Sequence, residues 1–255
     1  MNKKELRQAE LLKLIDMHGN LSAKDIAHIL HVSQMTIYRD LSELRQDGRL
    51  SAELTKAISH QDDDPSSYYL LRAIHESNDQ KEKIGQFAAS LIDQDDAIIL
   101  DIGSTIDKML PYIPEHKNIS IICFTANILA KLRHKKGIKI LFAGGTYHAN
   151  TELCESPEGL SFLSRLRANK VFVSAAGIHE DLGLTCVNDY ETATKQTNLK
   201  SAPEHILVAD SDKFGRVHSS YFCGLDEIHS IVTDRNLSSE WRNLLSEKEI
   251  VLHEV

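Results

Sequence analysis

Six short apolar runs, which alternate with amphipathic segments, constrain the fold of this chain most strongly. They lie at residues 97–101, 119–124, 138–143, 170–175, 205–210 and 229–234. Apolar runs of this length, bounded by turn residues, are typical of buried strands. Helix-like stretches such as EKIGQFAASLI and NILAKLRH lie between them. Strands that alternate with helices predict a doubly wound, mostly parallel α/β domain, which we place at residues 81–255.

The first 57 residues have a different pattern, because their apolar residues recur every three or four positions. Leucines and isoleucines over residues 11–15 form one apolar stripe of a helix. Ser22 precedes Asp25 by three residues, which predicts a capping box at the start of a second helix. Residues 58–80 include three consecutive aspartates and break the periodicity. We therefore predict a helical domain at residues 1–57 and a linker at residues 58–80.

The stretch His31–Gly48, HVSQMTIYRDLSELRQDG, predicts the recognition helix of a helix–turn–helix motif over residues 22–47. Its apolar residues recur at i, i+4 and i+7, so that Met35 and Arg39 fall on the opposite face. Gln34 can pair bidentately with adenine, and Arg39 suits guanine or phosphate. Residues 49–56 are predicted to form a short extended wing. The residues that we predict to contact DNA are Ser22, Ser33, Gln34, Met35, Thr36, Tyr38, Arg39 and Arg49. A small helical bundle that binds another protein fits the same pattern.

The charge distribution favours DNA binding by the N-terminal end alone. Residues 1–57 carry nine Lys and Arg against eight Asp and Glu, whereas the remainder carries 20 against 29. The acidic body therefore offers no general attraction to an anionic partner. No apolar run approaches the roughly 18 residues of a membrane span. The polar start MNKKELRQAELLKL indicates no signal peptide, so we expect a cytoplasmic protein without a membrane partner.

A second candidate site is the turn ILDIGST at residues 99–105. The predicted strand runs into Gly103, Ser104 and Thr105 and then into a helix-like segment. Such a turn brings free backbone N–H groups and two hydroxyls to a helix start, where a phosphate group binds well. The turn matches neither the P-loop nor the dinucleotide fingerprint, and an ordinary strand-to-helix turn fits the same residues.

Several other predicted strands also end in small or polar residues. The carboxyl ends of parallel strands meet at one edge of a sheet, so we expect a pocket for a polar, anionic small molecule there. Glu191 and Lys195 are four residues apart on a predicted helix, and they face either this pocket or the solvent as an ion pair. The residues that we predict to bind an effector are Asp101, Gly103, Ser104, Thr105, Thr125, Asn127, Gly144, Gly145, Gly177, Glu191, Lys195 and Lys213.

Signatures of catalysis and metal binding are weak in this sequence. His148 and Glu152 are the best enzymatic candidates, although ordinary solvated loop residues fit the same positions. The four cysteines lie 30 or more residues apart without a CxxC pair, and the thirteen histidines show no ligand spacing. We therefore expect free thiols, no metal and no cofactor.

Taken together, these motifs resemble the DeoR family of bacterial regulators of sugar metabolism, over nearly the whole chain. The family's N-terminal signature, VSxxTIRRDLxxLxxxG, is matched by Val32-Ser33, Thr36-Ile37, Arg39-Asp40-Leu41, Leu44 and Gly48. Its effector half is matched by EKIGQFAASLI, residues 101–105, Thr125 and Asn127, Gly144-Gly145, AAGI at 175–178, Glu191 and Lys195, and DSDKFG.

The sequence departs from the family pattern in two places. Tyr38 stands where the family usually has the first of two arginines. Residues 49–61 also lack the usual basic segment that ends in His-Gly-Gly-Ala. Both departures remove positive charge that contacts phosphate, which predicts weaker or redirected DNA binding.

The resemblance implies a winged helix–turn–helix followed by an α/β effector domain similar to the phosphosugar isomerase and CoA-transferase fold. It implies a repressor of a sugar-catabolic operon that binds double-stranded operator DNA and responds to a phosphorylated sugar. The phosphate is expected on Gly103, Ser104 and Thr105, with countercharge from Lys213. We expect a homo-oligomer, either a dimer or a tetramer, because paired half-sites increase specificity. The alternative is a sugar-phosphate isomerase or deaminase with an appended DNA-binding head.

Overall fold

The computed structural model describes residues 3–17, 21–51, 58, 70–75 and 77–255. The chain forms two compact units, residues 1–76 and residues 77–255. No helix in the described residues has the length and hydrophobicity needed to cross a lipid bilayer.

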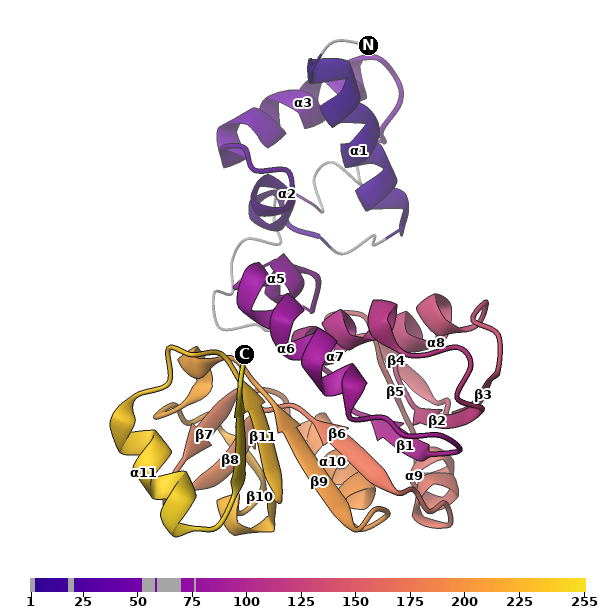
Figure 1. The fold of residues 1–255 in the computed structure, drawn as a ribbon. Helices are drawn as coiled ribbons and strands as arrows, with labels where there is room; N and C mark the ends of the chain where they lie inside the picture. The colour runs from indigo at the N-terminus through magenta and orange to yellow at the C-terminus, as the bar shows by residue number, and fades with distance from the viewer. Residues whose placement is uncertain (1–2, 18–20, 52–57, 59–69, 76) are drawn as a thin grey trace. The chain divides into compact units, whose positions relative to one another are not determined.

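The described part of the N-terminal unit is helical (Figure 1). Its helices are α1 (Lys3–Met17), α2 (Ala23–Ile29), α3 (Gln34–Gln46) and α5 (Leu70–His75). Leu11, Ile26 and Leu41 are fully buried in a common core. The apolar spacing of three and four residues thus places one face of each of the first three helices in that core.

The predicted capping box at Ser22 is confirmed, and Ser33 caps the next helix of the helix–turn–helix. Ser22 accepts a hydrogen bond from the backbone of Asp25, whose side chain accepts one from the backbone of Ser22 in return. The Ser33 hydroxyl accepts from the backbone of Thr36 and caps α3. These bonds satisfy amide groups that the first helical turn leaves without a partner. Of the predicted wing over residues 49–56, only residues 49–51 lie within the described part of the chain.

The second unit contains a seven-stranded sheet in which every strand pair is parallel. In spatial order its strands are β12 (Val251–Glu254), β11 (Ser230–Thr233), β9 (Glu204–Val208), β6 (Lys170–Val173), β1 (Ala97–Leu100), β2 (Ile119–Cys123) and β3 (Ile138–Phe142). Six of the seven correspond to the six predicted strands, so the predicted doubly wound α/β architecture is confirmed.

Several short strands were missed by the sequence analysis. They are β4 (Thr146–His148) paired with β5 (Leu153–Glu155), and the three-stranded sheet of β10 (Ser220–Cys223), β8 (Gly183–Cys186) and β7 (Gly177–His179). These pairs are antiparallel. None of them lies in a continuous apolar run like those of the six predicted strands, so the sequence pattern does not mark them.

Helices cover both faces of the large sheet (Figure 1). One face packs against α6 (Asn78–Ser90), α7 (Ser104–Met109) and α8 (Ala126–Leu132). The other face packs against α9 (Pro157–Ser164), α10 (Thr192–Leu199) and α11 (Ser239–Glu247). Within β1 the side chains alternate, since Ile98 and Leu100 belong to the first core and Ile99 to the second. Both faces are buried, as expected for a parallel sheet.

Part of the segment predicted as a linker is helical. Helix α5 buries Leu70 and Ala73, and α6 begins at Asn78, four residues before the predicted helix EKIGQFAASLI. Lys81 in the first turn of α6 is also buried. Hydrophobic periodicity therefore did not indicate this first turn, because the residue that it buries is charged.

The strand order reverses between β1 and β6. From β1 the chain moves to β2 and β3 on one side, whereas β6, β9, β11 and β12 follow one another on the other side. Open α/β sheets bind ligands outside the carboxyl ends of the strands at such a switch point. The topology therefore predicts that a ligand binds near the segments that follow β1 and β6, which begin at Asp101 and Ser174.

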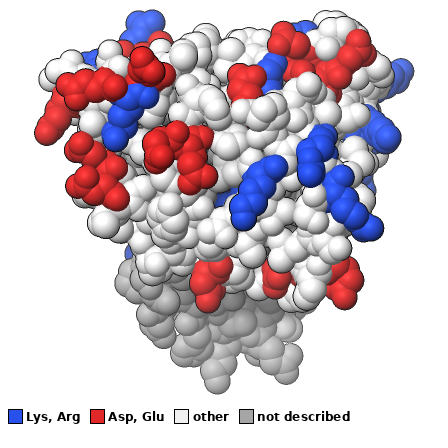
Figure 2. Space-filling model, turned by 90° about the horizontal axis from the view of Figure 1, so that it is seen from below, with Lys and Arg blue, Asp and Glu red and all other residues white. Residues whose placement is uncertain are grey.

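The surface charge of the described residues is mixed. Figure 2 shows acidic side chains at the upper left, at the upper right and in the lower part of this face, and a group of lysines and arginines at the right. This arrangement agrees with a net charge of −8 for the whole chain. A face that mixes both signs does not present the continuous basic surface that attracts nucleic acid.

We predict that Gly85→Ala destabilises the second unit by about 1–3 kcal/mol. A Cβ atom at Gly85 would lie 2.5 Å from the backbone carbon of Lys108, where α6 crosses α7. The measurement is urea unfolding followed by fluorescence of Trp241, the single tryptophan of the chain. Ser90→Ala, at an exposed position of α6, is the control. An unchanged urea midpoint for Gly85→Ala would show that α6 and α7 can move apart without loss of folding free energy.

Candidate functional site

The first turns of α3 carry most of the predicted DNA-contacting residues on their accessible side. Met35 is 75% exposed, and Ser33 and Arg39 are also exposed. The remaining three, Gln34, Thr36 and Tyr38, are half-buried. Gln34 Nε2 donates a hydrogen bond to Tyr38 Oη over 3.0 Å. Arg49 is exposed beyond the other end of α3, about 20 Å from the first turn of that helix for a helix of this length.

Ser22, which we predict to contact DNA, is 5% exposed. Its hydroxyl donates to Asp25 Oδ2 over 2.7 Å and accepts from the Asp25 backbone N–H over 3.1 Å. The predicted capping box is therefore confirmed, whereas the DNA contact of Ser22 stays a prediction, for a hydroxyl that is buried and whose hydrogen is already donated to Asp25.

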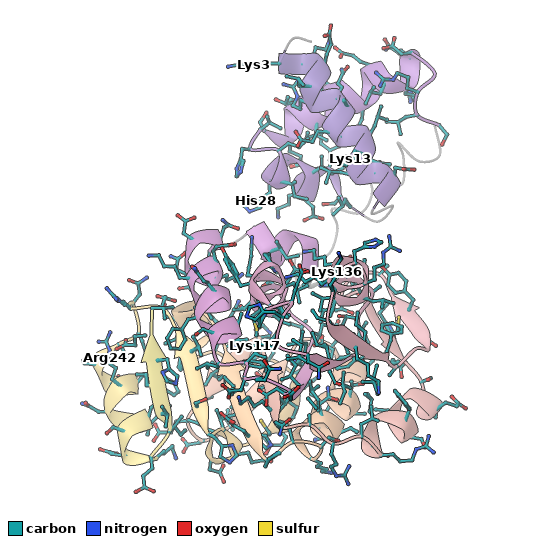
Figure 3. The ribbon with its side chains drawn as sticks, turned by 45° about the vertical axis from the view of Figure 1, so that its right-hand side comes forward. Lys3, Lys13, His28, Lys117, Lys136 and Arg242 are labelled. Carbon is teal, nitrogen blue, oxygen red and sulfur yellow. The ribbon has the colours of Figure 1, made fainter. Side chains whose placement is uncertain are left out.

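Asp40 and Arg7 form an interaction that fixes the recognition helix and that the sequence analysis missed. Arg7 Nε lies 2.5 Å from Asp40 Oδ2, and its Nη2 lies 3.0 Å from Oδ1. Asp40 is fully buried, and Gln8 donates to Glu43 over 2.8 Å one turn further along. These contacts hold α3 against α1. The N-terminal unit also carries exposed cations, among them Lys3 and Lys13 on α1 (Figure 3).

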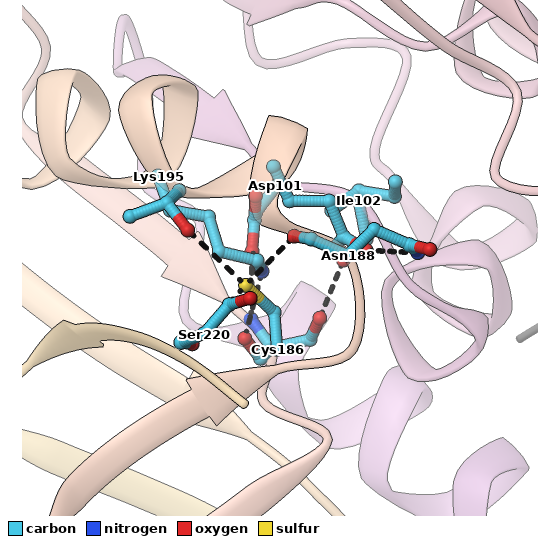
Figure 4. Close-up of polar contacts among 9 residues, drawn as sticks. Asp101, Ile102, Cys186, Asn188, Lys195 and Ser220 are labelled. Carbon is cyan, nitrogen blue, oxygen red and sulfur yellow. Dashed lines mark hydrogen bonds and ion pairs between the residues drawn. The ribbon is translucent and has the colours of Figure 1, made fainter. Parts of the chain in front are cut away.

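At the switch point of the sheet, a buried lysine meets the residue that follows β1. Lys195 Nζ of α10 lies 2.5 Å from Asp101 Oδ2 and donates to the backbone oxygen of Ser174 over 2.9 Å. The Ser174 backbone N–H donates to the same Asp101 oxygen over 3.1 Å. Figure 4 shows Lys195 facing Asp101, with Cys186 and Asn188 beside them. This cluster ties α10 to the carboxyl ends of β1 and β6.

Glu191 and Lys195 are buried, so the predicted alternative of a surface ion pair is wrong. Their exposed fractions are 6% and 2%. Burial opposes the charge on Lys195, but the carboxylates of Asp101 and Glu191 outweigh it and hold the pKa of Lys195 above its ordinary value. Burial raises the pKa of Glu191, and Lys195 and the side chain of Asn188 oppose that rise.

The turn after β1 requires glycine at residue 103. Gly103 has a φ of 143°, and a Cβ atom there would lie 2.4 Å from Ser174 Oγ. It precedes α7, and no side chain caps that helix. The first N–H groups of α7 therefore have no capping side chain, and Ser104 and Thr105 place hydroxyls beside them, 7% and 5% exposed.

Thr125 and Asn127 lie after β2 and are connected to α7. Asn127 Nδ2 donates to Asp107 Oδ1 over 2.9 Å, and Lys131 Nζ lies 2.5 Å from Asp107 Oδ2. Eight buried side-chain atoms have no hydrogen-bond partner among the described residues, and three of them are oxygens that follow β1 and β2: Asp101 Oδ1, Thr125 Oγ1 and Asn127 Oδ1. Buried polar atoms are normally paired, so these oxygens are available to partners from a ligand.

The other predicted effector residues have contacts of their own. A Cβ atom at Gly145 would meet the backbone of Glu155 in the β4–β5 hairpin, and Gly144 accepts a hydrogen bond from Ser156. Gly177 lies against the backbone of Arg216. The structure thus brings Asp101, Gly103–Thr105, Thr125, Asn127, Glu191 and Lys195 around β1 and β2, whereas Gly144, Gly145 and Gly177 mainly shape neighbouring loops.

Lys213 is half-buried in the short helix η4 (Ser211–Lys213) after β9. Burial lowers the pKa of His218, and the positive charges of Lys213 and Arg216 lower it further. Lys213 thus contributes positive potential on the β9 side of the sheet edge. An anion bound near Lys213 would raise the pKa of His218.

Four polar residues near this edge were not among the predicted site residues: Ser174, Asp107 and the buried pair Lys81 and Asp210. Lys81 Nζ lies 3.7 Å from Asp210 Oδ2, and both residues are almost fully buried. Ser174 and Asp210 end predicted strands, and that position is the signal that could have found them. Nothing in the local sequence marks Lys81 or Asp107.

The enzymatic candidates do not form a catalytic pair. His148 Nε2 lies 3.4 Å from Glu155 Oε1, and its ring stacks on Tyr190 with centroids 3.8 Å apart. Glu152 instead lies where burial and the charge of Asp107 raise its pKa. Among the described residues, no group of three or more His, Cys, Asp or Glu side chains could hold a metal ion. The four cysteines are free thiols.

A groove of about 640 Å³ lies apart from the predicted effector residues. Its lining residues are Lys83, Gln86, Phe87, Ser90, Arg235, Glu254 and Val255. They belong to α6 and to the carboxyl ends of β11 and β12, at one side of the sheet.

Comparison with known proteins identifies both units. Residues 7–53 match the DeoR-like helix-turn-helix domain, and residues 76–235 match the DeoR C terminal sensor domain. The lactose phosphotransferase system repressor of Staphylococcus epidermidis is 32% identical and covers 98% of this chain and 100% of its own. The HTH-type transcriptional regulator IolR of Bacillus subtilis is 27% identical, over 98% and 99%. The deoxyribose operon repressor of Escherichia coli is 28% identical, over 91% of each chain.

Solved structures show more distant similarity. Ribose 5-phosphate isomerase A of Methanocaldococcus jannaschii covers 55% of this chain and of its own, with a TM-score of 0.42 at 15% identity. The eIF2B beta subunit of Chaetomium thermophilum covers 90% of this chain and 85% of its own, with a TM-score of 0.45 at 13% identity. Similarity at this level says nothing about activity.

A helix–turn–helix unit joined to an α/β sensor domain defines a DNA-binding transcriptional regulator rather than an enzyme. The matches extend through both units and over nearly the full length of the relatives. The chain belongs to the DeoR family.

We predict that Asp101→Asn destabilises the second unit by about 3–5 kcal/mol, because it leaves the Lys195 ammonium buried without its countercharge. The double variant Asp101→Asn, Lys195→Met should recover most of this loss, since the buried ammonium is then gone and Glu191, whose pKa burial already raises, can bind a proton. Urea unfolding followed by Trp241 fluorescence measures both. A double variant less stable than Asp101→Asn alone would contradict this account of the cluster.

Proposed function

We propose that this protein represses a sugar-catabolic operon. We further propose that a phosphorylated sugar, bound at the carboxyl ends of β1 and β2, changes its affinity for operator DNA. The relatives described above include a repressor named for a deoxyribose operon and one named for a lactose phosphotransferase system. A regulator of chromosomal DNA in a bacterium acts in the cytoplasm, and we place the protein there.

The reading head in this proposal is the first half of α3. Capped helices α2 and α3 have the geometry that places a recognition helix in the major groove. Met35 and Arg39 are exposed there, and Ser33 and Thr36 stand at the helix start, where base edges are reached first. Arg39 supplies the charge for guanine or phosphate.

The three unpartnered oxygens of Asp101, Thr125 and Asn127 carry the ligand half of the proposal. The carboxylate oxygen of Asp101 and the amide oxygen of Asn127 only accept hydrogen bonds, so their missing partners are donors, whereas the Thr125 hydroxyl can donate or accept. Sugar hydroxyls are such donors. The N–H groups and hydroxyls of Gly103–Thr105 are donors instead, and they suit the acceptor oxygens of a phosphate group. A phosphorylated sugar presents both kinds of group on one molecule.

We propose a homo-oligomer, a dimer or a tetramer, as the form that binds DNA. One recognition helix contacts few base pairs, and two linked heads multiply affinity by the effective concentration that the link provides. The ligand weakens DNA binding if it binds more tightly to an arrangement of the two helix–turn–helix units that does not fit the half-site spacing. Bound DNA then lowers the affinity for the ligand by the same factor.

The test is a binding assay with the full-length protein and the DNA upstream of its own operon. Five- and six-carbon sugar phosphates are added one at a time, and each is matched by its unphosphorylated sugar. The proposal expects sequence-specific binding at moderate salt that a phosphorylated sugar changes and its parent sugar does not. Binding that is insensitive to every compound would remove the ligand half, and absence of specific binding would remove the DNA half.

Arg39→Ala is expected to weaken specific DNA binding by about 1–3 kcal/mol, because Arg39 is the exposed cation on the reading face. Affinity for the sugar phosphate should not change. Arg45→Ala makes the same charge change near the end of α3 and is the matched control. Fluorescence anisotropy with labelled operator measures both. Equal losses for the two variants would mean that Arg39 acts only through net charge.

Thr105→Val is expected to raise the sugar-phosphate concentration for half-maximal response about tenfold or more, because a hydrogen bond to a charged oxygen is lost at constant side-chain shape. Operator affinity without ligand should be unchanged. Thr197→Val on α10 is the control. A response identical to that of the original protein would place the phosphate away from the turn after β1.

A further inference from the structure

The hydrogen bond between Gln34 and Tyr38 lies within the predicted reading head. Gln34 Nε2 donates to Tyr38 Oη over 3.0 Å, and residues four positions apart are neighbours on a helix surface. Long side chains on a helix point back toward its N-terminus, so the ring of Tyr38 extends toward the helix start. Both residues are half-buried, whereas the adjacent Met35 is 75% exposed. The bond therefore holds the amide group of Gln34 at the edge of the accessible face.

The chemistry of the amide is compatible with base reading while this bond is present. The amide nitrogen of glutamine carries two hydrogens, and its oxygen accepts. Tyr38 takes one hydrogen. Bidentate pairing of glutamine with adenine uses one N–H toward N7 and the carbonyl oxygen toward the N6 amino group. The bond to Tyr38 and the pair with adenine thus use different groups of the same amide.

We propose that Tyr38 is a positioning residue whose hydroxyl orients the carboxamide of Gln34 to read an adenine in the major groove. This inference rests on DNA reading by α3 as proposed above, and it adds the base class, the reader and the residue that orients it. Orientation matters because a free glutamine loses rotamer freedom when it binds, and a side chain that is already ordered loses less.

The identity of residue 38 decides which of two roles the position can have. Tyrosine has a hydroxyl oxygen that accepts a hydrogen bond, whereas arginine has five donors and no acceptor. An arginine, which the family signature has at this position, cannot accept the hydrogen bond from Gln34 Nε2. It supplies positive charge for phosphate instead. In this chain the position gives up phosphate charge and fixes a base-reading side chain.

The experiment compares the full-length protein with Tyr38→Phe, Gln34→Ala and the double variant. A pool of duplexes with a randomised segment is selected with each protein, and affinities are then measured on the preferred duplex and on its single base-pair changes. The original protein should prefer adenine at one base pair, and Gln34→Ala should reduce that preference roughly tenfold to a hundredfold. Tyr38→Phe should reduce it at the same base pair, roughly threefold to tenfold. The double variant should show the same adenine preference as Gln34→Ala alone.

Two further variants separate orientation from phosphate contact. Tyr147→Phe removes a hydroxyl from an exposed tyrosine of the second unit and should change nothing. Tyr38→Arg should raise affinity for a duplex of unrelated sequence and steepen its salt dependence by about one unit, while it weakens the adenine preference. Circular dichroism of every variant establishes that α3 is folded.

Three results would overturn the inference. Tyr38→Phe could weaken binding to all sequences equally, which would make Tyr38 a phosphate contact. Tyr38→Phe could leave every base preference intact. It could also change the preference at a base pair other than the one at which Gln34→Ala reduces the adenine preference. If the original protein binds no duplex at all, then DNA reading by α3 itself fails, and that outcome is distinct from specific binding in which Gln34 has no part.

Discussion

The buried pair of Asp101 and Lys195 is the interaction on which the sensor domain depends. An isolated ammonium inside a protein costs several kcal/mol, so Lys195 is tolerated only because Asp101 and the backbone oxygen of Ser174 compensate it. Those partners follow β1 and β6, the two strands between which the sheet reverses its winding. One side chain of α10 therefore fixes the two segments between which the topology places a ligand. The Gly103 turn is held against Ser174 by the same arrangement.

The N-terminal unit uses a charged pair in the same way. Arg7 and Asp40 join α1 to α3 with two hydrogen bonds, and the carboxylate is fully buried. Such pairs add little net stability compared with apolar packing, but they tolerate few alternative geometries. A helix that reads base edges needs a defined rotation and depth, so an interaction that selects geometry is well suited to its inner side. Asp40 thus serves the motif from inside the protein, while Arg39 next to it faces outward.

Local signals explain which parts of the structure could be predicted. Ser22 and Ser33 start helices through bonds that span three residues, and the six long strands show in their apolar runs, so the sequence is sufficient for both. Lys195 meets Asp101 across 94 positions of sequence, and Arg7 meets Asp40 across 33. No local pattern encodes such contacts. For this reason Glu191 and Lys195 looked equally compatible with a surface pair.

The same distinction between charge and geometry bears on how the protein recognises DNA. Arginine at residue 38 would add phosphate attraction, which acts on all sequences and weakens with salt. Tyrosine gives no such attraction, but its hydroxyl accepts a hydrogen bond from Gln34 and, in the role proposed above, orders that side chain before DNA binds. In a chain with a net charge of −8, affinity then depends less on general attraction and more on the fit of a few oriented side chains. A helix–turn–helix of this kind loses more of its affinity when one base pair of the site is changed. An oligomer that binds with two such units multiplies that loss of affinity. The acidic composition and the tyrosine thus favour discrimination between sites over strength of binding.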